Sequence, residues 1–351
     1  MPRHPAKHKP VNTLPVGLRA AGFLLGFSTS MTAHDASPNP PTPPSHTDLS
    51  YGPEARQVMD VWLANGPHPT PCVMYIHGGG WLNNDKTKIE LSGAPAVFLR
   101  EGISFVSINY RYLQQTIIDS GSTEGAAPLQ PRGNYPLAPV SVPLGDIARA
   151  LQFIRSRAAE WNIDSARIAV SGASAGGCSA LWLAFHDDLA APAAADPVAR
   201  QSTKPWCAAV INAQTSLDPA QLHEWMPNNL YGGHAFGYVW DRSDKTAEFR
   251  SFLADRASVA TWIAAYSPYA LLTRDDPPVY LYYRNGPPAR GVEQKDPTHS
   301  ANHGALLAEK LGALSAHYEF VHAKSVAPRF KTPADYLIHQ LKQPQPASVP
   351  R

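Results

Sequence analysis

The stretch Ser171-Gly172-Ala173-Ser174-Ala175-Gly176-Gly177 lies near the middle of this 351-residue chain. The apolar run Ala166–Val170 precedes it and predicts a short buried strand. Apolar residues follow it at helical spacing, from Cys178 to Phe185, and predict a helix. We expect glycine at 172 and 176 because a Cβ there would collide with the packed strand or helix. A strand, a sharp glycine turn and a helix together predict an α/β fold with a serine exposed at a strand end.

Ser174, at the centre of this turn, is the candidate nucleophile. A serine hydroxyl is a weak nucleophile, so it needs exposure, a neighbouring base and donors for the oxyanion that its attack creates. The sharp turn supplies the exposure, and the N-terminus of the next helix directs backbone N–H groups at the reacting centre. A G-x-S-x-G pattern alone is equally well explained as a turn of small residues, so a second signal is needed.

The second signal lies upstream, where the run Pro71–Ile76 predicts a buried strand. This strand leads directly into His77–Trp81, which reads His-Gly-Gly-Gly-Trp. Such a run, upstream of G-x-S-x-G, is typical of the loop whose N–H groups form half of an oxyanion hole. We expect Gly78, Gly79 and Ala175 to donate the N–H groups of this hole.

The two glycine motifs together resemble those of the α/β-hydrolases of the H-G-G-G type, which include esterases, lipases, feruloyl-esterase-like and arylformamidase-like enzymes. The resemblance extends from about Tyr51 to Leu341, and Asn109-Tyr110-Arg111 after the predicted strand Ile103–Ile108 agrees with it. It implies an α/β-hydrolase fold, with a mostly parallel central sheet, helices on both faces and a cap insertion. It also implies a serine ester hydrolase of the carboxylesterase type, in which His77 shapes the oxyanion loop and is not the base.

Strands and helices alternate over this region, which also predicts a mostly parallel sheet covered on both faces. The expected strands are 58–63, 72–76, 103–108, 167–170, 208–213, 279–283 and 318–321, and the expected helices are 94–100, 144–161 and one from about 303. A long loop, 114–143, lies before the second helix.

The aromatic stretch Asp218–Ala265 interrupts the alternation. We interpret it as a cap over Ser174 that forms the substrate pocket, the alternative being helical packing outside the sheet. Trp81 is expected to form part of the wall of this pocket, the alternative being a packed indole without substrate contact.

The remaining catalytic groups should follow in the order acid, then histidine. The acid is expected soon after the strand Val279–Tyr283, but Gly286-Pro287-Pro288 occupies the first positions there. We choose Asp296, which precedes a turn and a helix, with Glu293 as the alternative. Without a catalytic role, Asp296 is an ordinary turn residue.

The base is expected after the last strand, where members of the family commonly carry Gly-x-Gly-His. This chain has His322 in that place, directly after the strand, and we choose it as the base for Ser174. His299 and His303 are the alternatives if the base has moved. His322 is otherwise a residue of the sheet edge.

These residues predict hydrolysis of small or medium acyl esters through an acyl-enzyme on Ser174. The substrate is a small-molecule or polysaccharide-linked ester, with acetyl or feruloyl as the acyl group. Two other functions fit the sequence: an amidase or peptidase on the same scaffold, and a catalytically weak binding protein that lacks a competent histidine.

Composition excludes several partners. The net charge is +2 with 17% charged residues, so no basic stripe for nucleic acid is present. No apolar run approaches the ~20 residues of an integral membrane span. Cys72, Cys178 and Cys207 lie in apolar stretches without a C-x-x-C pattern, which argues against a disulfide framework or a zinc site. The glycine run lacks the lysine of a phosphate loop, so no metal or other cofactor is expected.

The N-terminal residues 1–33 resemble a signal peptide, because four basic residues precede the apolar run Ala20–Phe27 and small residues follow it. Residues 34–50 are proline-rich and are expected to form a stiff linker before a hydrolase domain at 51–345. We therefore expect export to the periplasm or the medium, the alternative being a disordered leader.

If residues 1–33 are a cleaved signal peptide, the exported protein will lack the basic and apolar segments that contain Arg3 and Phe27. N-terminal sequencing of the exported protein tests this prediction. Exported material that still begins with Met1 contradicts it.

Overall fold

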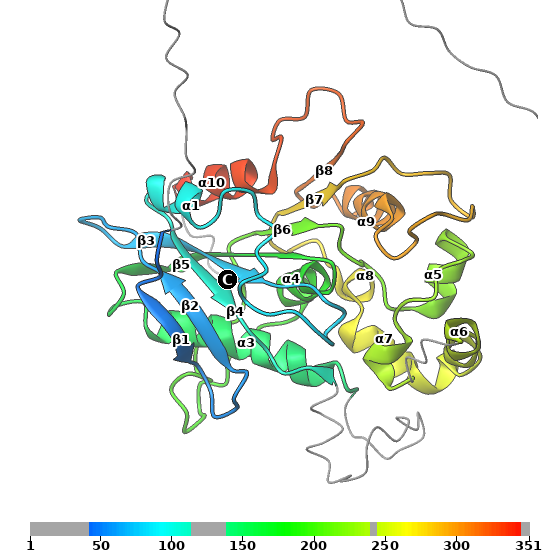
Figure 1. Ribbon diagram of the computed structural model, residues 1–351, viewed down its shortest axis with the longest axis horizontal. Helices are drawn as coiled ribbons and strands as arrows, with labels where there is room; N and C mark the ends of the chain where they lie inside the picture. Colours follow the sequence, from blue (N-terminus) through cyan, green and yellow to red (C-terminus); the bar gives the residue numbers. More distant parts are fainter. Residues whose placement is uncertain (1–41, 114–137, 239–243, 345–351) are drawn as a thin grey trace, which may run out of the picture. The chain divides into compact units, whose positions relative to one another are not determined.

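An eight-stranded sheet is the centre of the structure, in the order β1-β2-β4-β3-β5-β6-β7-β8 (Figure 1). This computed structural model describes residues 42–113, 138–238 and 244–344, which fold as one unit. The predicted signal peptide, residues 34–41 of the predicted linker and residues 114–137 of the predicted loop lie outside the described residues.

Most of the sheet is parallel, which confirms the predicted fold class. The strands are β1 (His46–Ser50), β2 (Val58–Trp62), β3 (Thr70–Ile76), β4 (Ser104–Ile108), β5 (Ile163–Ala173), β6 (Ala208–Ile211), β7 (Val279–Tyr283) and β8 (Tyr318–His322). β2 pairs antiparallel with both β1 and β4, whereas every later pair, from β4–β3 to β7–β8, is parallel. The carboxyl ends of β3 and β5 therefore lie at the same edge of the sheet.

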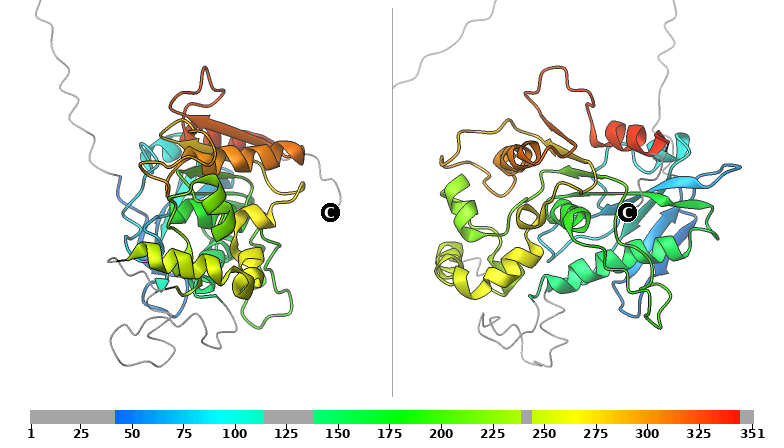
Figure 2. Two further views of the ribbon diagram at one scale, coloured as in Figure 1. Left: turned by 90° about the vertical axis from the view of Figure 1, so that its right-hand side faces the viewer. Right: turned by 180° about the vertical axis from the view of Figure 1, so that it is seen from behind.

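Helices cover both faces of the sheet. They are α1 (Ala96–Arg100), α3 (Ser141–Ser156), α4 (Ala175–Phe185), α9 (Ala301–Ala313) and α10 (Pro333–Lys342). Figures 1 and 2 show α1 and α10 together on one side of the sheet and α3 along the other. Each side has its own hydrophobic cluster, one with residues of α3, α4 and α9 and the other with residues of α1 and α10.

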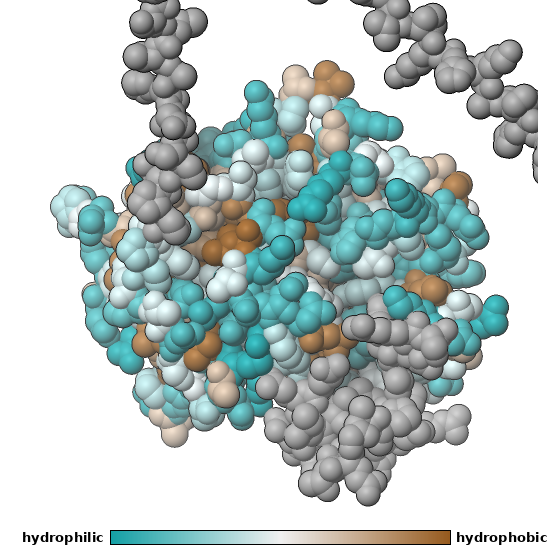
Figure 3. All heavy atoms as spheres, in the orientation of Figure 1, coloured by the Kyte–Doolittle hydropathy of each residue, from teal (hydrophilic) through white to brown (hydrophobic). Residues whose placement is uncertain are grey.

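Strand β3 shows why the sheet is buried on both sides. Its side chains alternate between the two clusters: Met74 belongs to the α3–α4 side, while Val73 and Tyr75 belong to the α1–α10 side. All three side chains are completely buried. Such a strand is a continuous apolar run in the sequence, which is the pattern of a parallel strand covered on both faces. The face of the molecule that is visible in Figure 3 is mostly hydrophilic, with separate apolar spots.

Strand β1 corrects the prediction that residues 34–50 are all linker. Its five residues, His-Thr-Asp-Leu-Ser, form an edge strand in which no side chain is fully buried. Backbone pairing with β2 holds it, for example between Leu49 and Met59. An exposed edge strand needs no apolar period, so the sequence carries no signal for it.

The segment between β6 and β7 forms a series of short helices, in the place of the predicted insertion. They are α5 (Pro219–Trp225), η1 (Gly233–Phe236), α6 (Lys245–Ala254), η2 (Arg256–Val259), α7 (Ala260–Tyr266) and α8 (Pro268–Leu271). Trp225, Phe236 and Phe252 are buried in the same hydrophobic cluster as α3 and α4. Figure 1 shows α5 beside α9, and α6 and α7 nearby. The insertion is thus anchored to the core by its aromatic side chains, and its role as a cap stays a prediction.

The three cysteines are free and buried in the core, as their apolar surroundings predicted. Burial raises the pKa of each thiol, because desolvation disfavours the thiolate. No helix among the described residues has both the length and the apolar character that a membrane crossing requires.

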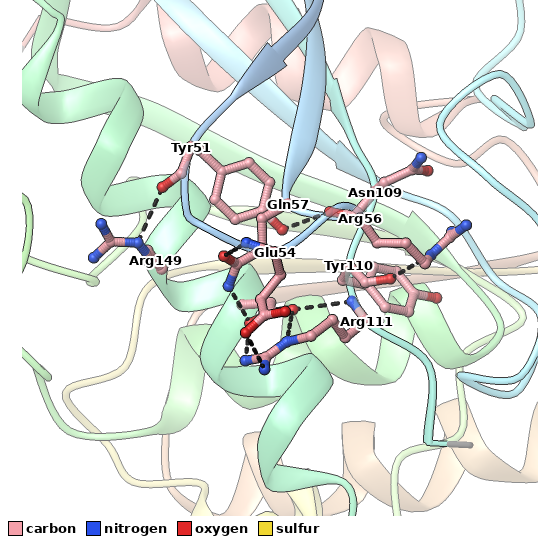
Figure 4. Close-up of polar contacts among 9 residues, drawn as sticks. Tyr51, Glu54, Arg56, Gln57, Asn109, Tyr110, Arg111 and Arg149 are labelled. Atoms are coloured by element: carbon pink, nitrogen blue, oxygen red, sulfur yellow. Dashed lines mark hydrogen bonds and ion pairs between the residues drawn. The ribbon is translucent and has the colours of Figure 1, made fainter. Parts of the chain in front are cut away.

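The buried carboxylate of Asp146 joins α3 to the residues that follow β4, and Figure 4 labels two of its partners, Gln57 and Arg111. Asp146 is 2% exposed, and Arg111 donates to it from the backbone N (2.9 Å), Nε (3.0 Å) and Nη2 (2.9 Å). Gln57 Nε2 donates to the same carboxylate at 2.7 Å. The network therefore fixes the residues that follow β4 against α3.

We predict that Asp146→Ala lowers the free energy of unfolding by about 2–4 kcal/mol, because it removes the carboxylate that these donors share. Urea unfolding measures the change. Glu160→Ala is the matched control: its ion pair with Arg157 is exposed on both sides, so the expected change is within about 0.5 kcal/mol. Equal losses in both variants would contradict the prediction.

Candidate active site

Ser174 lies in a strained turn between β5 and α4. Its backbone has φ +52° and ψ −126°, a conformation that residues with side chains rarely adopt. Two backbone hydrogen bonds hold the turn, from Ser174 N to Ile211 O (2.9 Å) and from Cys178 N to Ser174 O (2.8 Å). The side chain of Ser174 is only partly buried, so the turn presents its hydroxyl at the strand end.

The glycines that flank Ser174 are required by close backbone packing, as predicted. A Cβ on Gly176 would lie 2.2 Å from Ile76 O and 2.5 Å from His77 O. A Cβ on Gly172 would lie 2.5 Å from the backbone C and O of Gly176. The start of α4 therefore touches the end of β3, which brings the two glycine motifs together.

The Ser174 hydroxyl contacts an imidazole, and that imidazole contacts a carboxylate. Ser174 Oγ lies 3.0 Å from His299 Nε2, and His299 Nδ1 lies 2.9 Å from Asp296 Oδ2. The backbone N of His299 also donates to Asp296 Oδ1 at 3.2 Å. Because a carboxylate only accepts, the neutral form of this imidazole would carry its proton on Nδ1 and direct the lone pair of Nε2 at Ser174.

The structure corrects the choice of His322. This residue ends β8, where its Nδ1 accepts from Lys324 N at 3.2 Å and its ring lies 5.4 Å from that of Phe320. The imidazole in contact with Ser174 is that of His299, which lies on the loop between β7 and α9. The order serine, acid, histidine is kept, but the histidine follows the acid on one turn. The Asp-x-x-His spacing in the sequence is a local signal for the contact of His299 with Asp296, but not for the contact with Ser174.

Glu293 and His303, which the sequence also offers as acid and base, do not join this group. Glu293 makes no hydrogen bond to an imidazole within the ranges that the structure describes. His303 is fully buried, and its Nδ1 accepts from Thr215 N at 3.4 Å. Burial lowers the pKa of His303 to about 3, so the ring is neutral and serves the packing of α9.

The glycine loop after β3 packs directly against Ser174. A Cβ on Gly78 would lie 2.7 Å from Ala173 O and 3.2 Å from the Cβ of Ser174. Gly79 has φ +113°, and a Cβ there would lie 2.3 Å from Asn83 O. In residues 42–113, 138–238 and 244–344, no hydrogen bond uses the N–H groups of Gly78, Gly79 or Ala175. All three are therefore free to receive an acceptor.

The buried side chain of His77 stabilises this loop. Its Nδ1 donates to Gly78 O at 2.8 Å, and its ring is stacked on Tyr110 with 4.3 Å between centroids. Tyr110 in turn donates its hydroxyl to His77 O at 2.8 Å. Burial lowers the pKa of His77 to about 4, so the ring is neutral. This geometry agrees with the prediction that His77 shapes the glycine loop. Tyr110 is held in turn by Arg56, whose Nε donates to Tyr110 O at 2.9 Å (Figure 4).

Trp81 is a packed indole, which corrects its choice as a substrate contact. It is 0% exposed, and its Nε1 donates to Ser179 Oγ at 2.9 Å. Its ring lies 6.3 Å from that of Tyr231 and 5.8 Å from that of His234. It therefore offers a substrate no surface and serves to join the glycine loop to α4 and the insertion.

These groups form an arrangement that is suited to acyl transfer: a hydroxyl, an imidazole, a carboxylate and free N–H groups at a helix start. Within the described residues, no three His, Cys, Asp or Glu side chains are grouped to hold a metal ion.

Comparisons with known proteins agree with the fold. A family model described as BD-FAE matches residues 59–121 and 136–297, more than half of the chain. Similar solved structures include a truncated carbohydrate esterase from gut microbiota, at 16% identity and TM-score 0.56, covering 85% of this chain and 96% of that one. Esterase 2 of Thermogutta terrifontis phosphonylated by sarin is 18% identical, with TM-score 0.57 and coverage of 86% and 94%. Its butyrate-bound form is 18% identical, with TM-score 0.52 and coverage of 85% and 91%.

The contact of α4 with β3 yields a stability prediction. Gly176→Ala should lower the free energy of unfolding by about 1–3 kcal/mol or more, because the new Cβ meets rigid backbone. Gly145→Ala is the control: this exposed glycine of α3 has no atom within 4 Å of the added Cβ. It should stabilise the helix by about 0.5–1 kcal/mol. Thermal unfolding compares the two, and shifts of the same sign and size would contradict the packing argument.

Proposed function

The chain belongs to the BD-FAE family of α/β-hydrolase-type esterases, and from this premise we propose that it cleaves esters of small or medium acyl groups through an acyl-enzyme on Ser174. The observation that carries the proposal is the chain of contacts from Ser174 Oγ through His299 to Asp296. A hydroxyl, an imidazole and a carboxylate in this order are the working parts of a serine hydrolase.

The first step forms the acyl-enzyme. His299 Nε2 takes the proton of Ser174 while Oγ attacks the ester carbonyl carbon. Asp296 accepts the Nδ1 proton of the ring in a hydrogen bond and stabilises the imidazolium that forms. The imidazolium then gives its Nε2 proton to the departing alcohol. In the second step, His299 activates a water that releases the acid and restores Ser174.

The oxyanion is stabilised by the free N–H groups of Gly78, Gly79 and Ala175. Each donor of this kind contributes about 3–4 kcal/mol to the transition state. Ala175 is the first residue of α4, so the helix dipole adds to the attraction. The close packing of Gly78 on Ser174 supports this role, because it keeps the donors beside the hydroxyl.

The openness of the site favours an ester that is carried on a larger molecule. The side chains of His299 and Asp296 are 37% and 58% exposed, so water and a bulky alcohol group both have access. The carbohydrate esterase of similar fold fits this substrate class, and we extend the proposal to acetyl or feruloyl esters on polysaccharide. Export through residues 1–33 is part of the same proposal, because such substrates lie outside the cell.

The competing function, a weak binding protein, depended on the lack of a competent histidine. His299 provides an imidazole 3.0 Å from Ser174 Oγ, which favours the enzyme.

A fluorophosphonate probe and p-nitrophenyl acetate test the proposal. We expect the wild type to be labelled at Ser174 and to turn over the ester, and Ser174→Ala to do neither. His299→Ala should lower kcat by about 10⁴- to 10⁶-fold, because no other imidazole contacts the serine hydroxyl among the described residues. His322→Ala is the matched control and should keep a kcat close to that of the wild type. Folded wild-type protein that neither labels nor hydrolyses a short-chain ester would refute the proposal, and a loss in His322→Ala alone would refute the choice of base.

A further inference from the structure

The proposed acid and base lie on one exposed turn. Only two residues, Pro297 and Thr298, separate Asp296 from His299, and both catalytic side chains are substantially exposed. Packing on the side chains themselves is therefore weak. Reaction geometry nevertheless has to be kept within a fraction of an ångström, so the constraint must act on the backbone of the turn.

Two buried amide side chains hold that backbone. Gln214 Nε2 donates to Thr298 O at 2.8 Å, and Asn229 Nδ2 donates to Pro297 O at 3.1 Å. Gln214 and Asn229 are both 0% exposed. The carbonyls of both intervening residues, Pro297 and Thr298, thus accept hydrogen bonds from different parts of the chain.

Asn229 is itself fixed in the insertion, between α5 and η1. Its Oδ1 accepts from Tyr231 N at 2.8 Å, and its backbone N donates to Met226 O at 2.8 Å. Rotation of the amide would break the first of these bonds. The hydrogen bond from Tyr231 N to Oδ1 therefore directs the Nδ2 group of Asn229 at Pro297 O.

Gln214 lies on an equally rigid segment, just after β6. Its neighbour Ala213 accepts from the hydroxyl of Tyr283 at 2.6 Å. Its other neighbour, Thr215, donates from Oγ1 to His303 O at 2.8 Å. The segment that contains Gln214 is thus attached to the end of β7 and to the first turn of α9. These are the two elements joined by the loop that carries Asp296 and His299.

A second pair of hydrogen bonds joins the insertion to the loop between β7 and α9. Asn228 Nδ2 donates to Gln294 O at 2.8 Å, and Gln294 N donates back to Asn228 Oδ1 at 3.1 Å. The insertion therefore holds the loop at two places, before and after Asp296.

We propose that Gln214 and Asn229 are positioning residues that fix the Asp296–His299 turn against Ser174. The inference rests on the proposed function and adds a role for the insertion: through Asn229 it orients the base. Neither amide contacts the Ser174 hydroxyl, so their loss should act through His299 on kcat and leave KM little changed.

The test uses Gln214→Met and Asn229→Leu in the full chain, since each keeps the side-chain volume and removes the donor. Gln152→Met is the matched control. Its buried Nε2 donates to Ala199 O (3.2 Å) and Gln201 O (2.8 Å), in a loop that carries no proposed catalytic group. The measurements are kcat and KM for p-nitrophenyl acetate, the rate of fluorophosphonate labelling, and Tm.

We expect kcat and the labelling rate to fall together by about tenfold to a hundredfold in both variants, with Tm lowered no more than in the control. The same substitutions in a His299→Ala background should cause no further loss, because they act through the imidazole. If one variant fails to fold, the other carries the test.

Wild-type kcat in a folded Gln214→Met or Asn229→Leu protein would overturn the inference. So would an equal loss in Gln152→Met, or an undiminished effect in the His299→Ala background. The proposed function is tested separately by Ser174→Ala: full activity in that variant refutes the function, whereas an inactive Ser174→Ala beside a fully active Gln214→Met refutes only the positioning role.

Discussion

The contact between the start of α4 and the end of β3 is the constraint on which the site depends. A Cβ on Gly176 would lie 2.2 Å from Ile76 O, so only glycine permits this approach. The approach forces Ser174 into its positive-φ turn and presses Gly78 against it. One steric condition therefore places both the hydroxyl and the N–H groups that would receive the oxyanion. Neighbouring parallel strands make it possible, because the carboxyl ends of β3 and β5 meet at one edge.

Sequence alone predicts the part of the molecule that this constraint governs. The strand cores and the two glycine motifs are local patterns, and β7 and the buried core of β3 lie where their apolar runs placed them. The edge strand β1 is not predictable in this way, because its exposed side chains follow no apolar period. The prediction for Trp81 is wrong for a related reason: its burial depends on Ser179 and on the insertion, which are distant in sequence.

The imidazole that contacts Ser174 could not be chosen from sequence, because this contact is a tertiary property. His322 occupies the expected place after β8, but there it ends the strand and accepts from Lys324 N. His299 reaches Ser174 because the loop after β7 folds back, and hydrogen bonds from distant segments hold it there. The local Asp-x-x-His spacing explains only the contact of His299 with Asp296. Contact with Ser174 requires the whole loop to be placed.

Hydrogen bonds connect the insertion to the loop that carries Asp296 and His299. A cap that only covered Ser174 would not have this connection. An acid and a base on one turn move together, so any displacement of the turn changes the Ser174–His299 distance while the Asp296–His299 contact persists. The amides of Gln214 and Asn229 resist that displacement from β6 and from the insertion. The aromatic side chains that bury the insertion in the core, such as Trp225 and Phe252, make Asn229 a firm support. The packing of the insertion in the core therefore contributes, through Asn229, to the position of the proposed base.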